Sequence, residues 1–177
     1  MMVRVWDPLV RVFHWSLVAS FALAWFTSGA RGELHQWAGY AAASLVLMRL
    51  LWGFIGTPYA RFSQFVQGPK AVTKYLRAII TGNEVRHVGH NPAGGIMILA
   101  LLLAISITAL TGWLATTDSY YGDERVQILH SLCADGVLFL VLVHVGGVAL
   151  ASLHHRENLV KAMFTGRKRK AENTDIA

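Results

Sequence analysis

The sequence predicts an all-α membrane protein in which four helices cross the bilayer as a bundle. Hydrophobic residues make up 54% of the 177 residues and charged residues only 15%, whereas a soluble domain carries about a quarter charged residues. A helix needs about 20 apolar residues to cross a hydrocarbon core about 30 Å thick, and the chain contains four such stretches. One domain over residues 1–177 is the natural organisation at this length.

The four spans are expected at residues 8–27, 35–54, 92–115 and 126–153. The basic start of the first span also suits a signal peptide, but its apolar section is too long and is interrupted by Arg11 and His14. The third span begins at Asn91-Pro92, where Asn caps the helix and Pro occupies its first position.

Residues 69–80, in the long connection between the second and third spans, predict a short amphipathic helix on the membrane surface. An ordinary solvated helix is the open alternative. The apolar residues Val72, Tyr75, Leu76, Ile79 and Ile80 lie opposite Lys70, Lys74 and Arg77. Residues 166–177 are expected to form a disordered basic tail beside the last span, binding anionic lipid nonspecifically.

The distribution of basic residues gives the orientation of the spans. Basic residues concentrate in the connection of residues 53–91 and in the C-terminal tail, whereas the two remaining loops carry one each, Arg31 and Arg125. By the positive-inside rule, both termini and the long connection are cytoplasmic. The net charge of +6 is explained by this membrane orientation, so we expect no nucleic-acid partner.

Four histidines fall within or beside the apolar spans, namely His14, His35, His130 and His144. Ionisable residues inside a membrane are costly and mark functional sites, and imidazole is a common ligand of haem iron. With Cys133 as the only cysteine, covalent CxxCH attachment, iron–sulfur clusters and thiolate zinc sites are excluded. The histidines therefore predict two bis-histidine haem sites.

Depth in the bilayer pairs these histidines. The orientation places His35 and His130 at the outer surface and His14 in the cytoplasmic half, while His144 lies about 21 Å further along its helix than His130. The predicted pairs are His35 with His130 and His14 with His144. Fourteen residues leave His130 and His144 only about 40° apart around the helix axis, so both can face the bundle interior, and the third span serves as a wall.

Simpler interpretations exist for each of these side chains. A lone histidine in a span more often forms a hydrogen bond between helices, and zinc is disfavoured because no depth gathers three or four ligands. His87, His90, His154 and His155 are expected to be solvated at the interface, although His90, Arg11 and Arg49 are candidates to meet haem propionates or quinone oxygens. Cys133 is expected to be a packing residue.

The chain resembles the bacterial di-haem cytochrome b-561 family, which includes the cytochrome b subunits of nickel–iron hydrogenases. The resemblance covers nearly the whole chain and includes the fourteen-residue spacing of His130 and His144. Four stretches carry it: Val5-Trp6-Asp7-Pro8 through His14-Trp15, Arg49-Leu50-Leu51-Trp52-Gly53-Phe54-Ile55-Gly56, Gly89-His90-Asn91-Pro92-Ala93-Gly94-Gly95, and His155-Arg156-Glu157-Asn158-Leu159-Val160.

This resemblance implies a multi-pass protein of the bacterial inner membrane that binds two non-covalent haems b through His14, His35, His130 and His144. It implies an electron carrier of a respiratory chain, working between the quinone pool and a periplasmic redox protein such as a cytochrome c or another oxidoreductase subunit. Two alternatives remain open: a quinone-linked oxidoreductase acting on a small reductant such as superoxide, and a haem-free membrane anchor or proton-carrying transporter.

Overall fold

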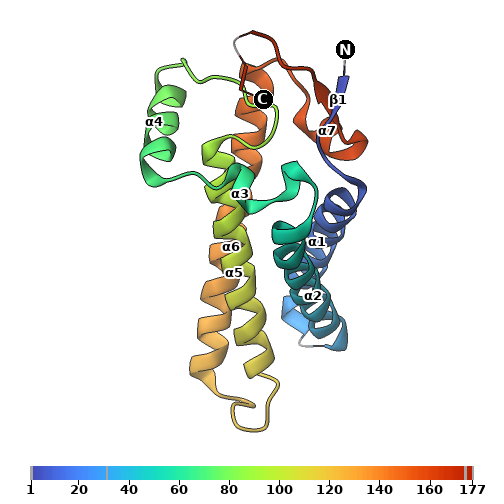
Figure 1. Ribbon diagram of the computed structural model, residues 1–177. Helices are drawn as coiled ribbons and strands as arrows, with labels where there is room; N and C mark the ends of the chain where they lie inside the picture. Colours follow the sequence, from blue (N-terminus) through green and yellow to red (C-terminus); the bar gives the residue numbers. More distant parts are fainter. Residues whose placement is uncertain (1, 31, 174, 177) are drawn as a thin grey trace. The chain divides into compact units, whose positions relative to one another are not determined.

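The structure, a computed structural model, describes residues 2–30, 32–173 and 175–176, and the helices account for most of them (Figure 1). Four helices are long and apolar enough to cross a membrane: α1 (Pro8–Phe26), α2 (Glu33–Ile55), α5 (Pro92–Leu114) and α6 (Glu124–His154). Every predicted span boundary lies within two residues of the observed one. The prediction of an all-α membrane fold with four spans is confirmed.

The remaining elements are short. They are the strands β1 (Met2–Arg4) and β2 (Arg167–Arg169), the 3₁₀ turns η1 (Ser28–Ala30) and η2 (Pro58–Ala60), and the helices α3 (Phe62–Phe65), α4 (Pro69–Ile80) and α7 (Leu159–Thr165). Of these, only α4 was predicted. Arg31, one of the loop residues used to orient the spans, lies outside the described residues.

The contacts divide the chain into two compact units, which we describe separately. The first unit comprises Met1–Arg11, Leu51–Leu99 and Val143–Ala177, and the second comprises Val12–Leu50 and Ala100–Leu142. That the chain forms one domain stays a prediction.

In the first unit, Asp7 joins the beginning of α1 to the end of α2. One carboxylate oxygen caps α1 by accepting the backbone N–H of Val10 at 2.8 Å. The other accepts hydrogen bonds from the Trp52 indole at 3.2 Å and the Thr57 hydroxyl at 2.5 Å. Burial alone would raise the pKa of Asp7, but these hydrogen bonds outweigh it and lower the pKa. The carboxylate therefore stays ionised and anchors both chain segments.

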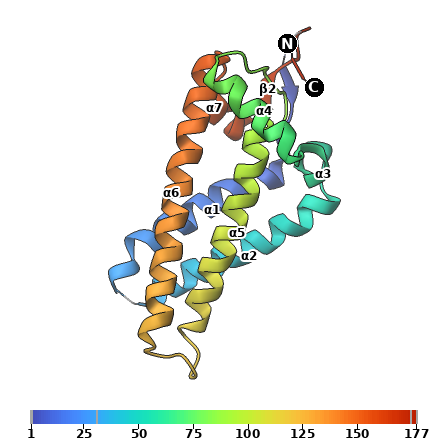
Figure 2. The same cartoon turned by 90° about the vertical axis from the view of Figure 1, so that its left-hand side faces the viewer.

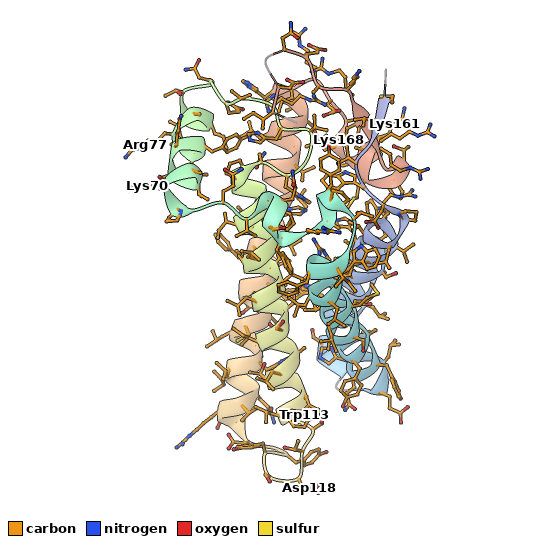
Figure 3. All side chains as sticks on the ribbon, viewed as in Figure 1. Lys70, Arg77, Trp113, Asp118, Lys161 and Lys168 are labelled. Atoms are coloured by element: carbon orange, nitrogen blue, oxygen red, sulfur yellow. The ribbon has the colours of Figure 1, made fainter. Side chains whose placement is uncertain are left out.

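Helix α4 spans the residues predicted for the surface helix. Figure 3 shows Lys70 and Arg77 projecting to the same side of the helix. Tyr75 is buried, whereas Leu76 and Ile80 are 45% and 85% exposed. An exposed apolar strip thus runs beside a basic strip, an arrangement that suits the lipid–water boundary; the placement of α4 on a membrane stays a prediction.

The prediction of a disordered C-terminal tail is wrong for the described part of that segment. Strand β2 pairs antiparallel with β1, and the backbone N–H groups of Val5 and Trp6 both donate to the Gly166 carbonyl. Gly166 ends α7 in the left-handed region, with φ of 76°, a conformation that favours glycine. The N-terminal strand therefore supplies the backbone partners that fix the tail.

A buried charge network holds the rest of the tail in the first unit. The Arg86 guanidinium binds both carboxylate oxygens of Glu157 at 2.9–3.1 Å and donates to one carboxylate oxygen of Asp175. Lys168, only 5% exposed, donates to the His87 carbonyl at 3.1 Å and lies 3.7 Å from Glu157. The basic residues expected to attract lipid headgroups are thus partly used to bind the protein itself.

The carboxyl groups of this network are held in their ionised form. Burial raises the pKa of Glu157, but hydrogen bonds from Arg86 and from the Arg169 backbone outweigh it, and the net pKa is lowered. The pKa of Asp175 is lowered first by the Glu172 backbone N–H and then by Arg86. Because both pKa values are depressed by folding, their stabilisation is complete above about pH 5 and is lost as the pH falls through the folded values.

In the second unit, residues 100–114 of α5 and residues 124–142 of α6 form an antiparallel hairpin. Figures 1 and 2 both show these two segments side by side, joined by the loop of residues 115–123. Figure 3 shows Trp113 near the loop that carries Asp118. This loop carries Asp118 and Asp123; its outer location and the cytoplasmic placement of the termini stay predictions.

The Arg86 network makes a direct prediction about the tail. Replacing Arg86→Met removes the guanidinium that binds the buried carboxylates of Glu157 and Asp175, and breaking a buried ion pair in this way costs about 3–5 kcal/mol. We expect residues 167–176 to detach, and hydrogen exchange followed by mass spectrometry should show faster exchange of their backbone amides. Lys170→Met, at an exposed position of the same tail, serves as the control and should leave the exchange unchanged. Equal protection in both variants would show that the network does not hold the tail.

Candidate functional site

Three of the four histidines singled out in the sequence belong to the second unit: His14 on α1, His35 near the beginning of α2 and His130 on α6. His144, on the same α6 helix, belongs to the first unit. Each lies on a helix that is long and apolar enough to cross a membrane.

His35 is oriented by the end of the preceding helix. Its Nδ1 atom lies 2.9 Å from the carbonyl oxygen of Ala24, which is among the last four carbonyls of α1 and so lacks a helical N–H partner. The arrangement requires Nδ1 to carry the proton and to donate it to Ala24. The second ring nitrogen, Nε2, is then left as the lone-pair atom, which is the form that binds a metal.

His130 is oriented in the same way by α5. Its Nδ1 atom lies 3.0 Å from the Thr108 carbonyl and 3.2 Å from the Thr111 hydroxyl. This approach depends on Gly112, because a Cβ atom there would stand only 2.9 Å from Cε1 of the imidazole. The carbonyl of Thr108 is therefore accessible to His130, and Nε2 is again left as the lone-pair atom.

The two imidazoles lie together in the second unit. The ring centroids of His35 and His130 are 6.0 Å apart and the ring planes are nearly perpendicular, at 86°. Two imidazoles on opposite sides of one metal atom, each with a bond of about 2 Å, place their ring centroids about 6 Å apart. The spacing and the two free Nε2 atoms would suit His35 and His130 as ligands that hold one haem iron.

An apolar groove of about 360 Å³ lies on the same unit, between α2 and α5. It begins at Gly39, one turn after His35, and ends at Trp113, the neighbour of Gly112. Its other lining residues are Tyr40, Ala43, Val46, Leu47, Leu50, Ser106, Ala109 and Leu110. The groove is apolar, and its lining includes neither His35 nor His130.

The predicted partner residues His14 and His144 belong to different units, and their pairing stays a prediction from depth. His14 packs edge-on against Trp15, with centroids 4.9 Å apart. His144 is half-buried on α6. The helix is continuous between His130 and His144, so the spacing of about 21 Å along its axis holds.

The other histidines are less solvated than expected. His90 lies within 4.6 Å of the rings of both Trp6 and Phe65, measured between centroids, and is a packing residue of the first unit. His87 packs against Tyr75, and burial is the main cause that lowers the pKa of His87.

At the end of α6, His154 lies beside an acidic side chain and His155 is partly buried. His154 lies 3.5 Å from the Glu84 carboxylate. His155 has a pKa lowered mainly by burial and secondarily by His154.

Arg11 and Arg49, the two candidates to meet haem propionates or quinone oxygens, lie against other parts of the protein. The Arg11 guanidinium donates to the Phe164 carbonyl at 2.6 Å, and Arg49 is only 3% exposed.

The residues that the sequence interpretation missed are on the third span. Thr108, Thr111 and Gly112 of α5 contact His130, although this helix was expected to act only as a wall. Two threonines and a glycine within five residues of a strongly apolar helix were the available signal, because polar side chains in a span mark contacts between helices.

Comparison with known proteins identifies the family. Residues 5–166 match the family model described as prokaryotic cytochrome b561. A probable Ni/Fe-hydrogenase B-type cytochrome subunit of Rhizobium leguminosarum bv. viciae is 22% identical, covering 94% of this chain and 88% of that protein. A protein of the same description from Bradyrhizobium diazoefficiens is also 22% identical, covering 94% of this chain and 85% of that protein. No solved structure matches the chain significantly.

The family match covers nearly the whole sequence and includes all four spans and all four candidate histidines. The chain therefore belongs to the prokaryotic cytochrome b561 family of membrane-bound b-type cytochromes, which bind haem b and transfer electrons.

Proposed function

We propose that this protein is a di-haem cytochrome b of the bacterial inner membrane that relays electrons between a periplasmic redox protein and the quinone pool of a respiratory chain. The observation that carries the proposal is the His35–His130 pair, with ring centroids 6.0 Å apart and each Nδ1 atom bound to a backbone carbonyl. We assign this pair as the axial ligands of the outer haem.

The second haem is inferred from the remaining histidines and the direction of the helices. His144 lies about 21 Å from His130 along α6, and His14 lies six residues after the start of α1, in the half of the bilayer that the charge distribution assigns to the cytoplasm. We assign His14 and His144 as ligands of the inner haem. Two haem levels would divide the membrane crossing into two short electron-transfer steps.

When bound, each haem would supply one reversible electron-transfer centre at its iron. The protein's contribution is to hold the ligands still. Hydrogen bonds from Nδ1 to the Ala24 and Thr108 carbonyls fix both the tautomer and the ring orientation, and such bonds increase the electron donation of a histidine ligand. Ligation by two histidines leaves no open iron position, so the protein is expected to carry electrons and not to bind oxygen.

The partner is inferred from the relatives, which are described as subunits of a Ni/Fe hydrogenase. This naming supports a role for the present chain as the membrane component of an oxidoreductase. A soluble periplasmic donor such as a cytochrome c has the same chemical requirement, namely access to the outer haem. In either case the quinone pool exchanges electrons with the protein inside the membrane.

The ligand assignment predicts which haem each substitution removes. The purified protein should contain two low-spin haems b, and His35→Ala or His130→Ala should remove the outer one while leaving the inner one. His14→Ala or His144→Ala should remove the other haem. Visible and electron paramagnetic resonance spectra with haem quantitation measure this outcome. A colourless protein would overturn the assignment. Loss of the same spectral species in the His14→Ala variant and in the His130→Ala variant would also overturn it.

Gly112 gives a test that leaves both ligands in place. Gly112→Leu would push against the His130 imidazole, because a Cβ atom alone already approaches it to 2.9 Å. We expect the outer haem to be lost or its potential to shift, with the inner haem spectrum unchanged. Gly136→Leu is the matched control on α6, since a Cβ atom at Gly136 has nothing within 4 Å. The same spectrum from both variants would argue against the assigned position of the outer haem.

Electron exchange with quinone is measured on the protein in lipid vesicles. A quinol should reduce both haems on the time scale of a mixing experiment, and reoxidation should follow addition of an oxidised soluble cytochrome c outside the vesicles. Loss of either haem should slow the overall transfer at least about tenfold, because the remaining step spans most of the bilayer. Transfer at an unchanged rate by the one-haem variants would contradict the relay.

A further inference from the structure

A cavity of about 370 Å³ lies beside the end of α6, and all the residues that line it belong to the first unit. Its charged lining residues are Glu84, Arg86, Arg156, Arg169, Glu172 and Asp175. Most of these charges are paired, since Arg86 binds Asp175 and Arg169 lies 3.2 Å from Glu172. Two are left over within the described chain: Glu84 has no Lys or Arg partner, and Arg156 has no carboxylate partner.

The Glu84 carboxylate is buried without a full set of hydrogen-bond partners. Its side chain is only 5% exposed, and Oε2 accepts no hydrogen bond from any residue that the structure describes. Oε1 lies 3.5 Å from Nδ1 of His154, a contact that becomes an ion pair only when the imidazole is protonated. Burying a carboxylate oxygen without a donor is costly. Because the terminal torsion of a glutamate is broad, the carboxylate can turn an oxygen toward a donor in the cavity.

The position of the cavity along α6 corresponds to the layer of lipid headgroups. His154 lies 15 residues after the middle of this 31-residue helix, or about 22 Å along the axis. A bilayer that includes its headgroups extends about 20–22 Å on either side of the midplane. With the middle of α6 at the midplane, the cavity therefore lies level with the headgroups.

An open apolar strip leads from the cavity toward the middle of α6. Leu150 and Gly147 precede His154 by four and seven residues, so the three residues share one face of the helix. Leu150 is 52% exposed, and a Cβ atom added at Gly147 would have nothing within 4 Å. An acyl chain can lie along this strip while its headgroup occupies the cavity, which favours a lipid over a water-soluble ligand.

The two leftover charges determine which headgroup fits. Every phospholipid offers a phosphate, which a guanidinium binds well. The primary ammonium of phosphatidylethanolamine adds three N–H donors for a carboxylate, whereas the trimethylammonium of phosphatidylcholine has no N–H group. An anionic headgroup without an ammonium leaves Glu84 without a donor and adds negative charge beside it.

We propose that the cavity at the end of α6 binds the headgroup of phosphatidylethanolamine, with the ammonium donating to the Glu84 carboxylate and the phosphate bound by Arg156. The acyl chains extend along Leu150 and Gly147. The membrane thereby supplies the two partners that Glu84 and Arg156 lack within the described chain. The site includes none of the proposed haem ligands, so it does not depend on the proposed electron transfer.

Lipid binding to the purified holoprotein, measured by native mass spectrometry, tests this proposal. Palmitoyl-oleoyl phosphatidylethanolamine should bind about tenfold more tightly than phosphatidylcholine with the same acyl chains, which is the effect of one hydrogen bond to a charged group. Glu84→Gln should abolish this preference. Arg156→Gln should weaken the binding of both lipids equally, because both contain the phosphate. Glu172→Gln is the matched control in the same cavity, since Glu172 is 61% exposed and paired with Arg169, and it should keep the preference.

Headgroups with one, two and three N-methyl groups provide a second measurement on the wild-type protein alone. The positive charge is the same throughout this series, but the third methyl group removes the last N–H donor, so affinity should fall most at that step. Circular dichroism establishes that each variant is folded. The proposal is overturned by equal affinity across the series, by an unchanged preference in folded Glu84→Gln, or by the same loss of preference in Glu172→Gln.

Discussion

Two accessible backbone carbonyls, one on α1 and one on α5, set the tautomer and the orientation of His35 and His130. The Ala24 carbonyl is accessible because α1 ends at Phe26, and the Thr108 carbonyl is accessible because Gly112, one turn later, has no side chain to cover it. Each accepts an imidazole Nδ1–H. This interaction compensates one ring nitrogen for the loss of water and leaves the other as the lone-pair atom.

The same physical requirement separates two kinds of polar group in the spans. The imidazoles of His35 and His130 have partners within their own unit, at 2.9 Å and 3.0 Å from carbonyl oxygens. Asp135 has none among the described residues and lies on an exposed face of α6. Since hydrocarbon offers no hydrogen bonds, the arrangement of the two imidazoles suits an internal cofactor site.

The first unit fulfils a different role, because most of its buried charges are satisfied by one another. Arg86, Glu157, Lys168 and Asp175 form a network that is almost completely buried. It joins the connection before α5, the segment after α6 and the C-terminal strand, while Asp7 joins α1 to α2. The ends of the apolar helices are thereby fixed without polar groups entering the spans.

The sequence by itself determined the four spans, because crossing a bilayer requires about 20 apolar residues in a helix, and it determined α4 through the period of its apolar residues. It also gave the candidate histidines and, through the charge distribution and the helical rise, a depth for each. The assignment of these histidines as haem ligands is our proposal, and the sequence pattern alone does not determine it.

Only the tertiary structure decided which distant groups meet. The C-terminal tail is ordered because Glu157 and Asp175 find Arg86, which lies 71 and 89 residues away in the chain, and composition cannot reveal such a match. Likewise, the roles of Thr108 and Gly112 depend on where α5 passes α6. Hydropathy and helical period are properties of one segment, whereas a hydrogen bond depends on the positions of two segments to within a fraction of an ångström.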